Sequence, residues 1–172
     1  MADIILHGLP VMLAVLSFWS NTEKKLLLLN LSLCLSMALL MLYMQAWGGM
    51  LVMLVAGGCT SYRLATQRLL NSALTGVLIT LMSVMIGVIN LHTINQGWLE
   101  ILPMLTFIFY RFGELYCREP ELRLCMVAGS GLFTLYGLIT QSWGVALTEA
   151  LFAASNAWYY LRLRRNAVRM AP

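Results

Sequence analysis

The chain has 172 residues, of which 60% are hydrophobic and only 10% are charged, and its mean hydropathy is +0.80. A soluble domain carries about a quarter charged residues, so the composition excludes one and predicts an integral membrane protein. Seven helices of roughly 20 residues, each crossing about 30 Å of hydrocarbon, would use nearly the whole chain. No room remains for a nucleotide-binding, protease or DNA-binding domain. The net charge of +4 is interpreted as a topology signal, and no nucleic-acid partner is expected.

Apolar runs separated by polar residues predict seven membrane-spanning helices. The start Met1-Ala2-Asp3 lacks the positive region of a signal peptide, so the first span is expected to be retained. The lipid bilayer is the expected partner of the seven spans. In chain order the spans cover about 4–19, 26–46, the segment from 50 to the arginines at 63 and 68, 70–91, 98–112, 124–140 and 144–163. The fold class is therefore all-α.

The basic residues favour one orientation of these spans. Lys and Arg collect in short cytoplasmic loops, and with seven spans all 11 of them fall on one side. This predicts an N-terminus outside and a C-terminus in the cytoplasm. The residues concerned are Lys24, Lys25, Arg63, Arg68, Arg111, Arg118, Arg123, Arg162, Arg164, Arg165 and Arg169.

An internal repeat is indicated by two similar segments. Gln45-Ala46-Trp47-Gly48 recurs as Gln141-Ser142-Trp143-Gly144, and Leu9-Pro10 matches Leu102-Pro103 near the starts of spans one and five. Two copies of three spans can share one orientation only if a further single span joins them. The predicted organisation is a first three-helix repeat over 1–68, a linker helix and outer loop over 69–97, a second repeat over 98–165 and a cytoplasmic tail over 166–172.

This parallel arrangement resembles that of the SWEET sugar transporters and their PQ-loop relatives, a known plan for carriers. Pro10 and Pro103 suit the comparison, although Val11 and Met104 follow them instead of glutamine. A closer resemblance is to the YgjV family of small bacterial inner-membrane proteins. Glu100-Ile101-Leu102-Pro103 and the stretch from Glu149 through Asn156 to Arg165 carry it. The resemblance implies a multi-pass protein of the bacterial inner membrane, without an established activity.

Polar side chains inside lipid are costly, so an acid within a span indicates a functional site. Apart from Glu100 at the outer end of span five, Glu149 is the only acid within the predicted spans, and Asn156 lies two helical turns deeper on nearly the same face. In the first repeat Thr60 occupies the position of Asn156. These three are the candidate substrate-binding residues, with Glu149 as a substrate or proton site. The alternative is that Glu149 reaches surface water and Asn156 bonds a neighbouring helix.

Other polar groups give weaker signals. His7, Asp3 and Glu100 fall at the outer ends of spans one and five, and we interpret them as an outer-face polar cluster at the interface. A metal site needs three or four ligands in a suitable geometry, so neither a metal nor a cofactor is expected. The mixed charges of the segment 111–123 predict a solvated, mutually paired loop.

The leading functional hypothesis is a carrier for a small solute of unknown identity, working by alternating access about a central site. The alternative is a non-transporting receptor, or an accessory subunit of a larger membrane complex. An enzyme is not expected, because the chain contains no acid–base or metal constellation. A second copy of the chain and another membrane protein both remain open as partners.

Overall fold

The computed structural model describes residues 2–43, 47–93, 99 and 101–170, with side chains described except at 2–7, 47–49, 51, 89–93 and 167–170. These residues form seven α-helices, a short 3₁₀ helix and no strand, in agreement with the all-α prediction. The elements are α1 (Ala2–Leu16), η1 (Ser17–Trp19), α2 (Glu23–Tyr43), α3 (Trp47–Thr66), α4 (Ser72–Thr93), α5 (Ile101–Tyr116), α6 (Glu119–Ile139) and α7 (Trp143–Met170).

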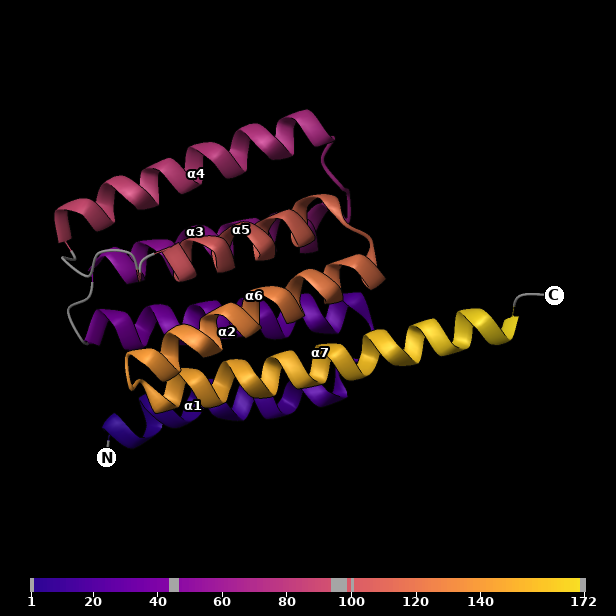
Figure 1. Cartoon of the computed structure of the whole chain (residues 1–172), viewed down its shortest axis with the longest axis horizontal. Coiled ribbons are helices and arrows are strands. Elements are labelled where there is room, and N and C mark those ends of the chain that lie inside the picture. The colour runs from indigo at the N-terminus through magenta and orange to yellow at the C-terminus, as the bar shows by residue number, and fades with distance from the viewer. Residues whose placement is uncertain (1, 44–46, 94–98, 100, 171–172) are drawn as a thin grey trace.

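The helices run roughly along one axis, and consecutive helices are antiparallel (Figure 1). We call α1–α3 the first half and α5–α7 the second half. In the first half α2 packs against both α1 and α3, and in the second half α6 packs against both α5 and α7. The halves meet where α1 contacts α7 and where α3 contacts α5. The remaining helix, α4, lies outside both halves and packs on α3 and α5.

The outside of the bundle is apolar. On α4 the exposed side chains Leu74, Val77, Leu81, Val84 and Val88 recur every three or four residues and so form one stripe. Among the described helices, α2 and α6 are long and apolar enough to cross a membrane, and Gly8–Trp19 and Ser72–Val88 are shorter apolar segments. Exposed apolar surface of this extent is typical of a protein that contacts lipid or a partner.

The turn between α6 and α7 is closed by backbone geometry. Gln141 has φ 56°, the left-handed conformation that commonly ends a helix. The Ser142 amide then donates to the Gly137 carbonyl at 2.7 Å. A Cβ atom at Gly137 would lie 2.8 Å from the Ala146 nitrogen, so this glycine lets α6 and α7 approach closely.

The two ends of the bundle differ in charge. We call the end where α1 gives way to α2, α3 to α4 and α5 to α6 the basic end, because Lys24, Lys25, Arg68 and Arg118 lie there. α7 also points its C-terminal part toward this end and extends beyond the other helices (Figure 1). The opposite end contains the α6–α7 turn and the start of α1.

The segment 111–123 was predicted to be a solvated loop, and this is wrong for most of its length, whereas the predicted pairing of its charges is confirmed. α5 continues to Tyr116 and α6 begins at Glu119, so only two residues separate the helices. Arg111, Glu114 and Arg123 are buried rather than solvated, with exposed fractions of 1%, 0% and 0%. They can be buried because each is paired: Arg111 with Glu114 at 2.5 Å, and Arg123 with Glu119 at 2.8 Å.

Candidate functional site

A cavity of about 90 Å³ lies between the two halves. Residues of α2 and α3 form one wall, and residues of α5, α6 and α7 form the other. Most of its lining is apolar, and the polar groups are few. We call this the central cavity; its polar lining residues are Asn30, Thr106, Tyr110, Arg111, Thr148 and Glu149.

Glu149 lies on α7, lines the central cavity and is half-buried. The Tyr110 hydroxyl of α5 donates to Glu149 Oε2 at 2.6 Å, and Ser130 Oγ of α6 lies 2.5 Å from the same hydroxyl. The carboxylate is therefore held by neutral groups from two other helices. Its direction toward the interior is what the cost of an acid facing lipid requires.

Close helix approach places Tyr110. A Cβ atom at Gly129 would lie 2.6 Å from the Tyr110 ring, so the ring packs directly on the backbone of α6. The edge of Phe152 meets the same ring, with centroids 6.5 Å apart. Thr106, one turn earlier on α5, donates to the Gly129 carbonyl at 3.0 Å. These contacts fix the hydroxyl that binds Glu149.

Asn156 does not join Glu149 in the cavity. It is fully buried on α7, and its amide donates to the Phe152 carbonyl of its own helix at 2.9 Å. The expected common face exists, but Phe152 lies on it between the two residues and lines the cavity itself. Asn156 lies about 10 Å farther along the helix than Glu149 and does not line the cavity.

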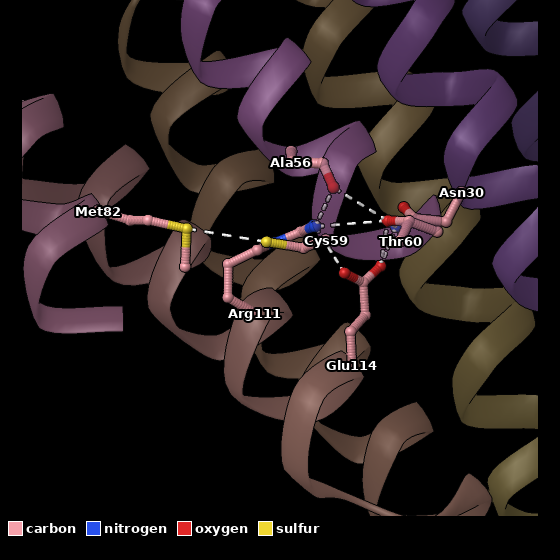
Figure 2. Close-up of polar contacts among 7 residues, drawn as sticks. All are labelled: Asn30, Ala56, Cys59, Thr60, Met82, Arg111 and Glu114. Atoms are coloured by element: carbon pink, nitrogen blue, oxygen red, sulfur yellow. Dashed lines mark hydrogen bonds and ion pairs between the residues drawn. The ribbon is translucent and has the colours of Figure 1, made fainter. Parts of the chain in front are cut away.

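Thr60 lies in a second buried polar group, drawn in Figure 2. Its hydroxyl donates to Glu114 Oε1 at 2.7 Å, and Asn30 donates to both Thr60 and Glu114. Arg111 Nη1 lies 2.5 Å from Glu114 Oε2 and donates to the Ala56 carbonyl at 2.5 Å. This network joins α2 and α3 to α5 across the two halves; Thr60 does not line the central cavity.

Sequence reasoning missed Arg111 and Glu114 as interior residues, and Glu149 is therefore not the only acid inside a helix of the bundle. Both fall within the loop predicted from the sequence, because a charge after an apolar run usually ends a span. Their spacing of three residues was the available signal, since residues i and i+3 meet on one face of a helix. Asn30, near the start of its predicted span, is 3% exposed and belongs to the network.

A wider cavity of about 480 Å³ lies beside the central one, toward the opposite end of the bundle. The two share Met37, Phe133 and Thr148 in their linings. The wider cavity continues to Ser142, Trp143 and Gly144 at the α6–α7 turn. We call it the vestibule.

Polar contacts join the halves at the basic end. In the first clamp, Arg63 of α3 pairs with Glu23 of α2, and its Nη2 lies 3.5 Å from the Cys117 carbonyl after α5. In the second clamp, Arg123 and Tyr159 from the second half donate to carbonyls of the first. The contacts are Arg123 Nη2 to Ser20 O at 2.8 Å, Tyr159 Oη to Phe18 O at 2.7 Å, and Arg123 stacked 4.7 Å over the Tyr159 ring.

The expected outer-face cluster lies largely beyond the described part of the structure. Asp3 and His7 belong to α1, but their side chains fall outside it, and Glu100 falls outside it altogether. Within the described residues, no group of three or more His, Cys, Asp or Glu side chains could hold a metal ion.

The fold and the cavity define a helical bundle with an apolar exterior and a small, mostly apolar cavity between two halves, with an acid in its lining. A family model described as bacterial inner membrane protein, Imp-YgjV, matches residues 1–167. The chain therefore belongs to this family of bacterial inner-membrane proteins, which confirms the resemblance to the YgjV family. No curated protein and no solved structure matches the chain.

Proposed function

We propose that the protein is a carrier for a small solute that works by alternating access, with Glu149 at its central site. In this proposal all seven helices cross the inner membrane, the N-terminus is outside and the basic end faces the cytoplasm. Chain orientation follows from the excess of Lys and Arg at that end. An acid held between helices inside such a bundle is suited to bind a solute or a proton.

The observation that carries the proposal is the asymmetry of the path between the halves. The central cavity adjoins the vestibule toward the opposite end, whereas both clamps lie at the basic end. An outward-facing carrier requires this combination of an access route on one side and a closure on the other. Opening the clamps while closing the vestibule would expose Glu149 to the cytoplasm.

A SWEET-like relation between the halves is supported by their packing. Under a two-fold relation, the contact of α1 with α7 corresponds to the contact of α5 with α3. The shift of 96 residues that aligns Trp47 with Trp143 also aligns Glu23 with Glu119 and Arg63 with Tyr159. Each half would therefore supply one clamp to the other, and the halves could rock as units about the central site.

The proposal is tested by distances between spin labels in a variant whose four cysteines are replaced by serine. One pair, at Lys25 and Arg118, reports on the basic end, and a second pair, at Leu42 and Leu138, reports on the opposite end. All four side chains are exposed. Arg63→Ala removes the side-chain contacts of the first clamp, and Tyr159→Phe removes one of the two hydrogen bonds of the second. Weakening the clamps in this way should lengthen the first distance and shorten the second.

A rigid receptor or accessory subunit, the alternative function, would show neither change. A lengthening of the first distance without a shortening of the second would indicate local loosening and would contradict alternating access.

A further inference from the structure

We propose that the central cavity binds a small organic cation with an apolar body, with the Glu149 carboxylate as its counter-charge. The proposal rests on the carrier function and names the class of its solute. It is drawn from three properties of the cavity: the charges that line it, the side chains that form its walls, and its size.

The lining charges do not balance. Arg111 and Glu149 are the charged side chains among the described lining residues. Arg111 is already compensated, because its guanidinium lies 2.5 Å from Glu114, a fully buried acid outside the lining. Glu149 has hydroxyl partners at Tyr110 and Ser130, which bind a carboxylate without neutralising it. A cationic solute would supply the missing charge.

The walls suit an apolar cation better than a strongly hydrated one. Aromatic rings from three helices line the cavity: Phe107 and Tyr110 from α5, Phe133 from α6 and Phe152 from α7. Rings of this kind attract organic cations through their faces. The remaining wall is largely aliphatic or thioether, including Leu33, Met37, Val52 and Met53, and it offers few groups to replace a water shell.

The size limits the solute. A volume of about 90 Å³ is well below the roughly 300–1,000 Å³ of pockets for drug-sized ligands. Methylated ammonium ions are compact enough to serve as probes. The same cavity should reject an anion of equal shape, because Glu149 would repel it, and should bind a neutral isostere more weakly.

The test uses three probes built around a four-substituted central atom: tetramethylammonium, neopentyl alcohol and pivalate. Each is titrated into the purified full-length protein, and binding is followed by calorimetry and by the shift in melting temperature. Ammonium and trimethylammonium extend the cation series to smaller sizes. We expect tetramethylammonium or trimethylammonium to bind more tightly than ammonium and to stabilise the protein, with no binding of pivalate and weaker binding of the alcohol.

Glu149→Gln should weaken cation binding by about tenfold or more, because the amide carries no negative charge to attract the cation. The matched control is Glu121→Gln, an exposed acid at the start of α6, which should leave binding unchanged. If Glu149→Gln fails to fold, the charge preference of the unmodified protein still decides the proposal.

Failure of both methylated cations to bind, binding of ammonium as tight as theirs, or equal binding of the three isosteres would overturn the proposed solute class. Those results would not change the spin-label distances, so the carrier function would still be tested by those distances alone. Conversely, cation binding without any change in those distances would identify the cavity as the site of a receptor.

Discussion

At the scale of single residues, the proposed function depends most on Glu149, the acid at the central site. It could be identified from the sequence because it is an acid well inside an apolar run. The side chains that hold Glu149 could not be identified in this way. Tyr110 lies 39 residues from Glu149 along the chain, and Ser130 lies 20 residues from Tyr110, whose hydroxyl it contacts. Helical periodicity correctly placed Asn156 on the same face of α7 as Glu149. It could not reveal that the lining of the cavity on this face ends at Phe152, before Asn156.

Glu149→Gln should abolish proton-driven transport while the protein still folds and inserts. The amide keeps the size of the side chain but cannot carry the charge that a proton or a cation neutralises. Proton movement into proteoliposomes with a coupled solute is the measurement, and Glu121→Gln is the control. Transport with an unaltered pH dependence in Glu149→Gln would reduce this residue to a structural role.

Gly129→Ala should disturb the site without touching Glu149. The new methyl group would lie 2.6 Å from the Tyr110 ring, and relieving this overlap costs about 1–3 kcal/mol of stability. Gly131, two residues away on α6, has no neighbour within 4 Å of the place that a methyl group would take. Gly131→Ala should therefore be neutral or slightly stabilising. Thermal unfolding of the two variants compares them directly, and equal stabilities would contradict the packing described for Tyr110.

At the scale of elements, the number and order of helices could be predicted from apolar runs, but several ends could not. The α5–α6 connection is the clearest case, because hydropathy treats Arg111 as the start of a loop. Tertiary pairing with Glu114 and hydrogen bonds to α3 instead keep this arginine inside the bundle. The two clamps could not be predicted from the sequence either. The hydrogen bonds that form them join residues 40 or more positions apart along the chain.

Cys117 is a native reporter of the first clamp. Its carbonyl accepts from Arg63, and burial raises the pKa of its thiol to about 12. Only about one thiol in ten thousand is then ionised at pH 8, and the thiolate is the reactive form. With the other three cysteines replaced by serine, maleimide should label Cys117 slowly.

Arg63→Ala removes a positive charge that lowers the pKa of this thiol, but opening the clamp also admits water and relieves the burial that raises the pKa most. Because burial is the larger cause, the variant should speed the labelling by about tenfold or more. Arg68→Ala removes an exposed arginine nearby and serves as the control. A labelling rate that does not change in Arg63→Ala would show that this contact does not close the basic end.

At the scale of the whole molecule, the distribution of basic residues predicts the topology. Reporter fusions at Thr93 and after Pro172 should give periplasmic and cytoplasmic signals respectively. Replacing Lys24 and Lys25 should not invert the protein, because nine of the 11 basic residues still favour the same orientation. Signals from the same side at both fusion points would exclude seven spans.

The two-fold organisation was predicted from few identities in a leucine-rich chain, and it stays a prediction. The site itself does not follow the repeat. Met53 occupies the position of Glu149 in the first half, and Asn30 has Met126 as its counterpart. A symmetric frame with an asymmetric site would let one half hold the charge while the other moves past it.

Access to the central cavity from each side of the membrane tests the carrier account most directly. Thr148 lines both the central cavity and the vestibule, so Thr148→Cys in the cysteine-free protein reports on the path beside Glu149. An impermeant thiol reagent should label it from the periplasmic side when the clamps are intact. With Arg63→Ala and Tyr159→Phe, labelling should appear from the cytoplasmic side and fall from the periplasmic side. Labelling confined to one side in both proteins would contradict alternating access.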